Sequence, residues 1–583
     1  MKHSLPQLLI LTAVCLLAAC GTPDNSDKMI FRYNESAGIA TLDPAYSKDQ
    51  ALNWGCSQLY NGLVQLDTAL EVQPCIAKRW TVSDDGKTYT FILRDDVWFH
   101  KSEWFGTPDS TRRVVAQDFV YSLSRILDPK VASPGMWIFS EVDTSADFAN
   151  ALMSECASGA TTNQAIKQSS NQAIQKYGFA ALDDTTFVIR LRQPFAPFLG
   201  LLSMPYCSVL PREVVEHYGV DFRKHPCGTG PFQFQMWKEG VKLVLRRNPL
   251  YFEYDTVRQS GSKVIRRLPY LDAVAVTFIV DRQTAFLEFV KGNLDLMNSL
   301  APSYKDELLT STGQLRAKYA DRIDMVSTPF LNTEYLGFRM DGDDSPLKDR
   351  RIRQAICYGF DRRKMMKYMR NNIGRPGCNG FIPYGLPGFD TSNVRYEYNP
   401  ERSRQLLAEA GYPGGKGLPE LKMASTATYA DLCKYIQQQL GIVGINVKID
   451  VNPPAALREQ IAQGKSAWFR GSWIADYPDA ENYLSLFYSP NFCPQGPNYT
   501  HFSSKVFDRL YEQAKRETDP ARRNEIYRQM DNLVMDEAPV VVLYYDQILH
   551  FTHKNVSGLR SNAMNALDLR RVKIGSVPGL GKY

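Results

Sequence analysis

The sequence predicts an α/β protein built from more than one lobe, and three observations support this class. The chain has 583 residues, which is more than one hydrophobic core normally organises. Helical and strand patterns alternate between about residues 350 and 545, as is typical of an α/β lobe. The first half is instead dense in strand signals, which indicates a separate, more β-rich region.

The composition is that of a globular protein. Hydrophobic residues make up 44% of the chain and charged residues 22%, so sizeable cores can form. The net charge of +6 is small for this length, and the basic residues are scattered along the chain. A nucleic-acid partner is therefore not predicted, because such a partner requires a concentrated basic surface.

The N-terminus indicates export and lipid anchoring. The apolar run at residues 8–19 has the length of a signal-peptide core and is too short to span a membrane. It ends in Leu17-Ala18-Ala19-Cys20, which resembles the bacterial lipobox, in which the cysteine is acylated. Residues 1–19 are therefore predicted to be a signal peptide, Cys20 the lipid anchor and residues 20–28 a polar tether. The alternative is an ordinary signal peptide that is cleaved near Ala19.

In the first half, turn signals separate strand patterns. Asp85-Gly86 lies between two β-prone runs within residues 72–100 and predicts a hairpin. Residues 114–126 carry apolar side chains at helical spacing and predict a helix. A second hairpin is predicted over 179–193, a strand over 273–280 and a helix over 283–291, whereas 130–175 is predicted to be irregular.

The second half alternates between helices and strands. Helices are predicted over 346–358, from 361, over 400–410 and over 430–440, and strands over 445–451 and 540–544. Asn399 at the N-cap, Pro400 in the first turn and Gly411 at the C-terminus delimit one of these helices. Another helix starts after Asp519-Pro520.

The most informative stretch is 467–479, an apolar, aromatic run that predicts a buried strand delivering Asp476 to its end. Arg470 and Trp473 lie inside it, where a plain core strand would carry aliphatic residues. A cation, a flat aromatic ring and an anion this close together could line a pocket for a zwitterion. The alternative is an ordinary strand in which Arg470 and Asp476 are satisfied by protein partners.

Motifs for catalysis or cofactor binding are missing from the sequence. It contains no phosphate-binding or dinucleotide-binding glycine loop, no nucleophile elbow and no Cys/His cluster with zinc spacing, so no cofactor or metal is predicted. Nine of the 11 cysteines follow Cys20 without a C-x-x-C pair, which favours isolated buried thiols, with one or two bridges left open. Asp476 and Asp479 could form a glycosidase-like acid/base pair, but an enzyme is not the favoured interpretation.

A set of segments, in this order, resembles the solute-binding proteins of peptide ABC transporters, which are family 5 of the bacterial extracellular solute-binding proteins. The set includes Leu59-Tyr60-Asn61-Gly62-Leu63, Gly228-Thr229-Gly230-Pro231-Phe232 and Trp473-Ile474-Ala475-Asp476-Tyr477. The other members are residues 42–44, 76–80, 85–91, 116–123, 353–356, 406–412 and 555–559. No single segment is decisive, but their order along the chain is specific.

The resemblance implies a two-lobed periplasmic-binding-protein fold of type II, with a ligand cleft between the lobes and an extra β-rich subdomain. The first lobe would consist of residues 29–65, 185–280 and 541–583, with the extra subdomain at 66–184. The second lobe would be the single insertion 281–540. The protein would lie in the periplasm or at the cell surface, as a monomer that passes its ligand to the permease subunits of an ABC transporter.

The resemblance also implies a site for short peptides. Asp476 would pair with the peptide α-ammonium, Arg470 would be available to its carboxylate, and Trp473 would lie against the peptide. Ser472 to Ile474 and the loop near Tyr60 to Leu63 would pair with the ligand backbone like neighbouring strands. The resulting candidate residues are Asp476, Trp473, Arg470, Ser472, Ile474, Tyr477, Tyr60, Asn61, Gly62 and Leu63.

Some features depart from the family pattern and leave the length and identity of the ligand open. Residues 101–113 interrupt a usually short connection, and 130–175 is hard to match. Cys433 stands where oligopeptide binders can carry a histidine, so a contact to longer peptides is in doubt. Nickel, an oligosaccharide or an opine-like solute on the same fold is the nearest alternative, and a secreted hydrolase is the alternative from another class.

Overall fold

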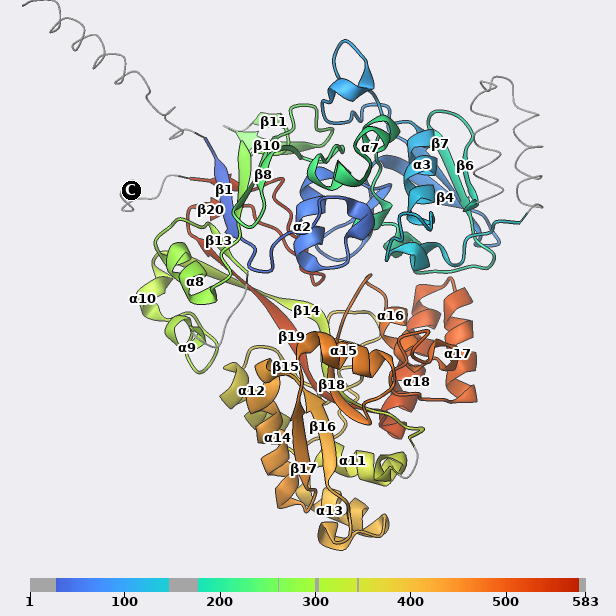
Figure 1. The fold of residues 1–583 in the computed structure, drawn as a ribbon, viewed down its shortest axis with the longest axis vertical. Helices are drawn as coiled ribbons and strands as arrows, with labels where there is room; N and C mark the ends of the chain where they lie inside the picture. The colour runs from blue at the N-terminus through green and yellow to red at the C-terminus, as the bar shows by residue number, and fades with distance from the viewer. Residues whose placement is uncertain (1–27, 146–176, 260–261, 299–303, 343–344, 576–583) are drawn as a thin grey trace, which may run out of the picture.

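The computed structural model describes residues 28–145, 177–259, 262–298, 304–342 and 345–575. It is a mixed α/β protein in which an upper body, the first lobe, lies above a tapering lower body, the second lobe (Figure 1). An 11-stranded sheet connects the two lobes, in the order β17-β16-β18-β14-β19-β13-β1-β12-β9-β8, with β15 (Arg375–Pro376) paired to β19. Its two long members, β14 (Ile323–Phe338) and β19 (Val540–His553), pair antiparallel and pass from one lobe into the other.

The first lobe packs its part of this sheet against a short helix. Strand β1 (Ile30–Asn34) pairs in parallel with β12 (Ala273–Thr277), followed outward by β9 (Lys242–Arg247) and β8 (Phe232–Lys238). Helix α2 (Gln50–Leu59) contributes Trp54 to the core beneath these strands. The smaller elements of this lobe are β2 (Val64–Leu66), β3 (Val72–Pro74), α6 (Phe198–Leu201), α7 (Arg212–Tyr218), β10 (Tyr254–Gln259), β11 (Ser262–Arg267), β20 (Val556–Ser557) and β21 (Lys573–Ile574).

A separate four-stranded sheet extends the first lobe, in the order β4-β5-β7-β6. It consists of β4 (Ala77–Val82), β5 (Thr88–Leu93), β6 (Phe179–Ala181) and β7 (Thr186–Arg190), and α3 (Ala116–Ile126) packs against it. The hairpin at Asp85-Gly86 is confirmed, and Gly86 has the positive φ of +69° that its turn requires. The second predicted hairpin and the predicted helix are confirmed as well.

The second lobe surrounds β16 (Leu421–Ser425), β17 (Val447–Val451) and β18 (Trp468–Ile474) with helices. These helices are α11 (Arg350–Tyr358), α12 (Arg362–Arg370), α13 (Pro400–Glu409), α14 (Ala430–Ile442), α15 (Pro454–Ala462), α16 (Glu481–Leu484), α17 (Lys505–Arg516) and α18 (Pro520–Glu537). Asp361, Asn399 and Asp519 each accept a hydrogen bond from a backbone N–H of the first turn that follows. The predicted starts of these three helices are thereby confirmed, whereas the helix predicted over 346–358 is a 3-10 turn at Pro346–Lys348 followed by α11.

A third group of elements lies beside the long strands. Helices α8 (Arg282–Val290), α9 (Lys305–Leu308) and α10 (Ala317–Ala320) form their own apolar cluster with the ends of β14 and β19. Strand β13 (Leu296–Met297) pairs with β1 of the first lobe. The residues after 281 therefore begin on the first-lobe side of the long strands, and the predicted lobe boundaries stay predictions.

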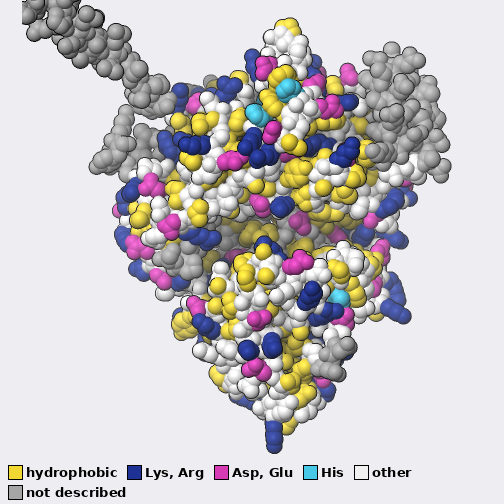
Figure 2. Space-filling view, viewed as in Figure 1, with side chains coloured by type: hydrophobic (Ala, Val, Ile, Leu, Met, Phe, Trp, Pro, Cys, Tyr) yellow, Lys and Arg dark blue, Asp and Glu magenta, His cyan; other side chains and the backbone are white. Residues whose placement is uncertain are grey.

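The two lobes enclose a hollow and touch at one side of it. Figure 2 shows this hollow running between the upper and lower bodies. On the contacting side, Lys515 Nζ of α17 lies 3.1 Å from Glu141 Oε1 of the first lobe. The ring of Tyr477, just after β18, lies 6.0 Å from the ring of Trp137. Side chains that follow β18 therefore lie between the lobes.

Two further sets of predictions can be compared with the described residues. All eight described cysteines are unpaired and buried, which confirms isolated thiols for this part of the chain. Cys20, the signal peptide and most of the predicted irregular stretch lie outside the described ranges. Within those ranges, no helix has both the length and the apolar character needed to cross a bilayer.

Candidate functional site

Strand β18 carries a backbone edge without a neighbouring strand in the described part of the chain. It pairs antiparallel with β14 along its whole length, whereas β16 reaches it only at Phe469. The Ala475 N–H donates to the Leu331 carbonyl on the β14 side, over 2.9 Å. Because successive residues of a strand direct their backbone groups to opposite sides, Ser472 and Ile474 present theirs at the open edge.

The prediction that this strand is buried is wrong for its second half. Trp468 and Phe469 are buried in the second-lobe core, but Ser472 is exposed and the Ile474 side chain is 51% exposed. The cause is the single-residue pairing with β16, which leaves the strand uncovered beyond Phe469. An apolar sequence at this position is therefore consistent with a surface that receives another chain.

Asp476 follows β18 and is held by one neighbour, Asn482 of α16. The Asn482 side-chain amide donates to Asp476 Oδ2 at 3.2 Å, while its oxygen accepts from the Asp476 N–H and from the Trp473 indole at 2.9 Å. Asp476 is exposed to solvent, yet burial by the surrounding protein raises the pKa of its carboxyl. No described cation forms an ion pair with this carboxylate; Arg470 and Arg523, the arginines of the neighbouring ion pairs, contact Glu334 and Asp479 instead.

Arg470, in contrast, is already compensated. Its guanidinium forms an ion pair with Glu334 of β14 and lies 3.3 Å from the centroid of the Tyr429 ring. Burial raises the pKa of Glu334, and Arg470 opposes that shift. Within the described residues, Arg470 Nε has no hydrogen-bond partner. The guanidinium therefore holds β18 against β14 and keeps one N–H unused.

The aromatic residues of the predicted site differ in their accessibility. Trp473 is half-buried and its indole is fixed by Asn482. Tyr477 is buried between the lobes, and its hydroxyl donates to Glu481. Asp479 accepts from the Tyr527 hydroxyl at 2.7 Å and from the Glu481 N–H at 2.9 Å, so it is turned into the protein and does not face a substrate beside Asp476.

The structure does not join the loop of Tyr60 to Leu63 to the edge of β18. The carbonyls of Asn61, Gly62 and Leu63 accept hydrogen bonds from the first lobe's own backbone at Val209, Ile76, and Cys75 and Ala77. The Tyr60 hydroxyl donates to Leu42, and Leu63 is buried. These carbonyls are consequently occupied in the structure.

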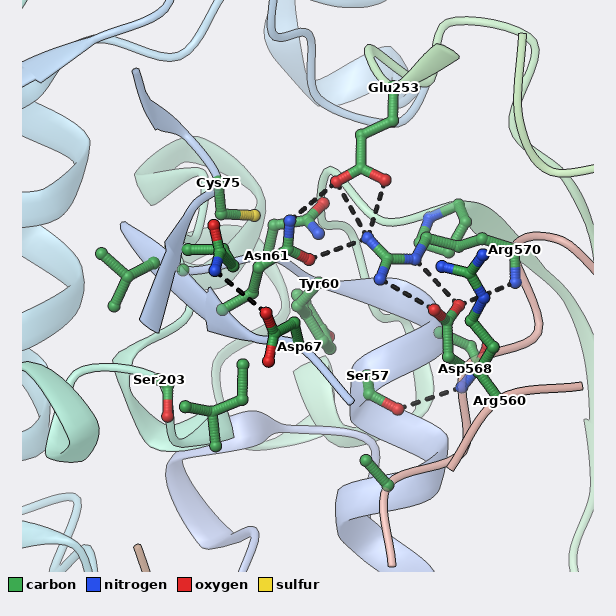
Figure 3. A pocket seen from close by; sticks show the side chains of 18 of the residues that line it. Ser57, Tyr60, Asn61, Asp67, Cys75, Ser203, Glu253, Arg560, Asp568 and Arg570 are labelled. Carbon is green, nitrogen blue, oxygen red and sulfur yellow. Dashed lines mark hydrogen bonds and ion pairs between the residues drawn. The ribbon is translucent and has the colours of Figure 1, made fainter. Parts of the chain in front are cut away.

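Tyr60, Asn61 and Gly62 instead line a cavity of about 630 Å³ inside the first lobe (Figure 3). Three of its charged side chains are paired with one another: Arg570 donates to Glu253 Oε2 at 2.7 Å and to Asp568 Oδ1 at 2.8 Å. The remaining wall comes from segments around Asp67, Ser203 to Pro205 and Arg560 to Asn562. Asp67 in this wall accepts hydrogen bonds from the Gln73 side-chain amide and from backbone N–H groups, and it forms no ion pair with a described cation. Asp476 differs from it by lying beside the open edge of β18.

The cavity wall and Asp476 nevertheless approach each other across the lobes. Tyr206 directly follows Pro205, which lines the cavity. Burial is the main cause that raises the pKa of the Tyr206 hydroxyl, and the negative charge of Asp476 raises it further. Sequence reasoning missed Tyr206, Asn482 and Glu334. Asn482 is only six residues from Asp476 and could have been considered, but the other two are distant in sequence and gave no signal.

Comparisons with known proteins agree on one family. Residues 71–492 match the model described as bacterial extracellular solute-binding proteins, family 5. Di/tripeptide-binding protein 2 of Pseudomonas aeruginosa is 25% identical over 91% of this chain and 92% of its own. The glutathione-binding protein GsiB of Escherichia coli K12 is 25% identical over 90% of each chain.

Solved structures share the fold. The periplasmic binding protein DppA of Helicobacter pylori, in complex with the peptide STSA, superposes with a TM-score of 0.70, at 23% identity over 95% of this chain and all of its own. The murein tripeptide-binding protein MppA in its unliganded open form gives a TM-score of 0.71, at 24% identity over 94% of this chain and 98% of its own. The two-lobed architecture with a cleft between the lobes is therefore that of solved binding proteins.

Proposed function

The chain belongs to family 5 of the bacterial extracellular solute-binding proteins, and we propose from this premise that it is a receptor for short peptides. As a member of this family it is a binding protein of the extracytoplasmic space and not an enzyme. The receptor would take up its ligand in the hollow between the lobes and deliver it to an ABC permease. It would work as a monomer.

The observation that supports this proposal most strongly is Asp476, a solvent-exposed carboxylate that has no described cation as a partner and lies beside an open strand edge. A peptide offers the two matching groups, an α-ammonium for Asp476 and backbone amides for Ser472 and Ile474. Strand addition provides affinity without regard to side-chain sequence. Neither charge tolerates burial alone, so pairing and lobe closure support each other.

The names of the relatives point to ligands of this chemistry. Di- and tripeptides and glutathione all carry an α-ammonium and at least one peptide-like amide. The predicted contact from Arg470 to the ligand carboxylate stays a proposal, because Glu334 already compensates that cation. The Tyr60 to Leu63 loop is proposed to act through the cavity it lines, which could receive a ligand side chain.

Calorimetry with a panel of ligands tests the proposal. The panel contains alanine peptides of two to five residues, glutathione, a nickel–histidine complex and a maltooligosaccharide. Binding of at least one peptide or of glutathione, and its loss when the amine is acetylated, is the expected result. Tight binding of the nickel complex or the sugar, with no response to any peptide, would contradict it.

Lipid anchoring at Cys20 is a separate part of the proposal, supported by the lipobox-like sequence alone. Cys20→Ser should yield an unlipidated protein that is either uncleaved or soluble, and its partitioning into detergent should change. Unchanged partitioning into detergent would reject the anchor without affecting the ligand assignment.

A further inference from the structure

A thiol, an imidazole and a carboxylate lie in line on the second lobe, outside the site described above. Cys493 Sγ lies 3.1 Å from His501 Nε2, and His501 Nδ1 lies 2.6 Å from Asp341 Oδ2. Cys493 and His501 belong to the loop between α16 and α17, and Asp341 follows the end of β14. The ligand site leaves all three residues unused.

The surroundings fix the imidazole and the carboxylate. The Phe492 ring stacks on His501 with the ring centroids 4.6 Å apart and the planes within 2°. Arg339 Nε donates to Asp341 Oδ1 at 2.8 Å. Although burial alone raises the pKa of Asp341, the hydrogen bonds from Arg339 and His501 bring it below its usual value. A charged Asp341 thus orients His501 with Nε2 toward Cys493, where this nitrogen lies 3.1 Å from both the sulfur and the carbonyl oxygen.

Cys493 differs from the other described cysteines. It is the one whose sulfur lies within hydrogen-bonding distance of an imidazole, whereas Cys433 contacts the Ser425 hydroxyl at 3.2 Å and Cys227 a carbonyl at 3.4 Å. Cys493 itself is 4% exposed, whereas the side chain of Asp341 is 46% exposed. The thiol is therefore buried, while the carboxylate at the other end of the alignment is open to solvent.

The environment also defines how such a thiol would react. Burial raises the pKa of the Cys493 thiol, so a free thiolate is scarce and the proton needs a nearby base. His501 Nε2 is that base, and Asp341 stabilises the imidazolium that forms. The family is extracytoplasmic, and disulfides persist in such compartments.

We propose that Cys493 is an S-thiolation site, at which the Cys493–His501–Asp341 alignment promotes reaction with small disulfides. The Cys493 proton moves to His501, and the thiolate attacks one sulfur of the disulfide. A mixed disulfide forms at Cys493 while the original S–S bond breaks, and the departing thiolate takes the proton from His501. The products are one modified protein and one small thiol, so no further oxidant is needed.

Site-resolved kinetics test this proposal on the full chain. The native protein is treated with 2-hydroxyethyl disulfide and quenched with acid, and the adduct at each cysteine is quantified by peptide mass spectrometry. Cys493 should react at least about tenfold faster than Cys433, its matched buried control. His501→Gln should slow Cys493 by about a hundredfold, because the proton acceptor is lost.

A second reagent separates activation from access. Methylmercury binds thiols without such assistance, so its rate at Cys493 should be unchanged in His501→Gln. If that variant does not fold by circular dichroism, Asp341→Asn replaces it, since its side chain is partly exposed and is expected to slow the disulfide reaction in the same direction. The proposal is overturned if Cys493 reacts no faster than Cys433, or if the folded variant keeps the wild-type disulfide rate.

Discussion

Replacing Asp476 by Asn should weaken peptide binding specifically through the peptide amine. The substitution removes the charge but keeps the size of the side chain and its contact with Asn482. Truncating one partner of a buried, hydrogen-bonded charge pair costs about 2–5 kcal/mol. Since Asp476 is exposed before the ligand arrives, the lower part of this range applies, about 2–3 kcal/mol, or roughly 30- to 150-fold in Kd.

The assay is a double-mutant cycle by calorimetry on the wild type and Asp476→Asn, each with a peptide and with its N-acetyl form. If the carboxylate and the ammonium contact each other, the two changes are not additive. Acetylation should then cost the wild type roughly 30- to 150-fold and cost the variant much less. Glu525→Gln, on the exposed surface of α18, serves as the matched control and should behave like the wild type. Independent, additive effects would refute the assignment and make Asp476 a structural residue.

Four further outcomes are expected. Burial by the protein raises the pKa of Asp476, and the peptide ammonium favours the charged form of this carboxyl. The affinity for peptide should therefore be constant at neutral pH and fall as the pH drops through a value above 3.8. The same fall in Asp476→Asn would contradict this explanation. Glu334→Gln leaves Arg470 buried without its ion-pair partner, so it should lower the free energy of unfolding in urea by about 3–5 kcal/mol. The same variant should make peptide binding more sensitive to amidation of the peptide C-terminus. When each peptide amide is N-methylated in turn, one position should lower the binding free energy by about 1 kcal/mol, namely the amide that pairs with Ser472 or Ile474. Equal affinity for all N-methylated peptides would argue against strand addition. Small-angle scattering should give a smaller radius of gyration with ligand than without it, and superimposable curves would count against lobe closure.

Local signals predicted the secondary structure well. Asp361, Asn399 and Asp519 cap the helices they were expected to start, because an N-cap acts on backbone groups only two or three residues away. The hairpin at Asp85-Gly86 formed for the same reason, since its turn depends on the conformation of one glycine. The strand before Asp476 was also located correctly, but its burial was not, because the extent of pairing with β16 is a tertiary property.

The partners of the site residues could not be predicted from the sequence. Glu334, which compensates Arg470, lies 136 residues earlier in the chain and meets it only through the pairing of β14 with β18. The loop of Tyr60 to Leu63 was placed beside the ligand by resemblance, yet its carbonyls are bound by backbone groups as far away as Val209. Asp341 lies 160 residues from His501, so that alignment became visible only in three dimensions.

We propose above that the protein holds peptides by their amine at Asp476. Native mass spectrometry of the protein purified without refolding measures this most directly, because ligands in closed pockets stay bound through isolation. We expect a set of adducts with peptide masses in the wild type and their loss in Asp476→Asn. A single adduct of the mass of nickel or of a sugar, retained in the variant, would contradict it.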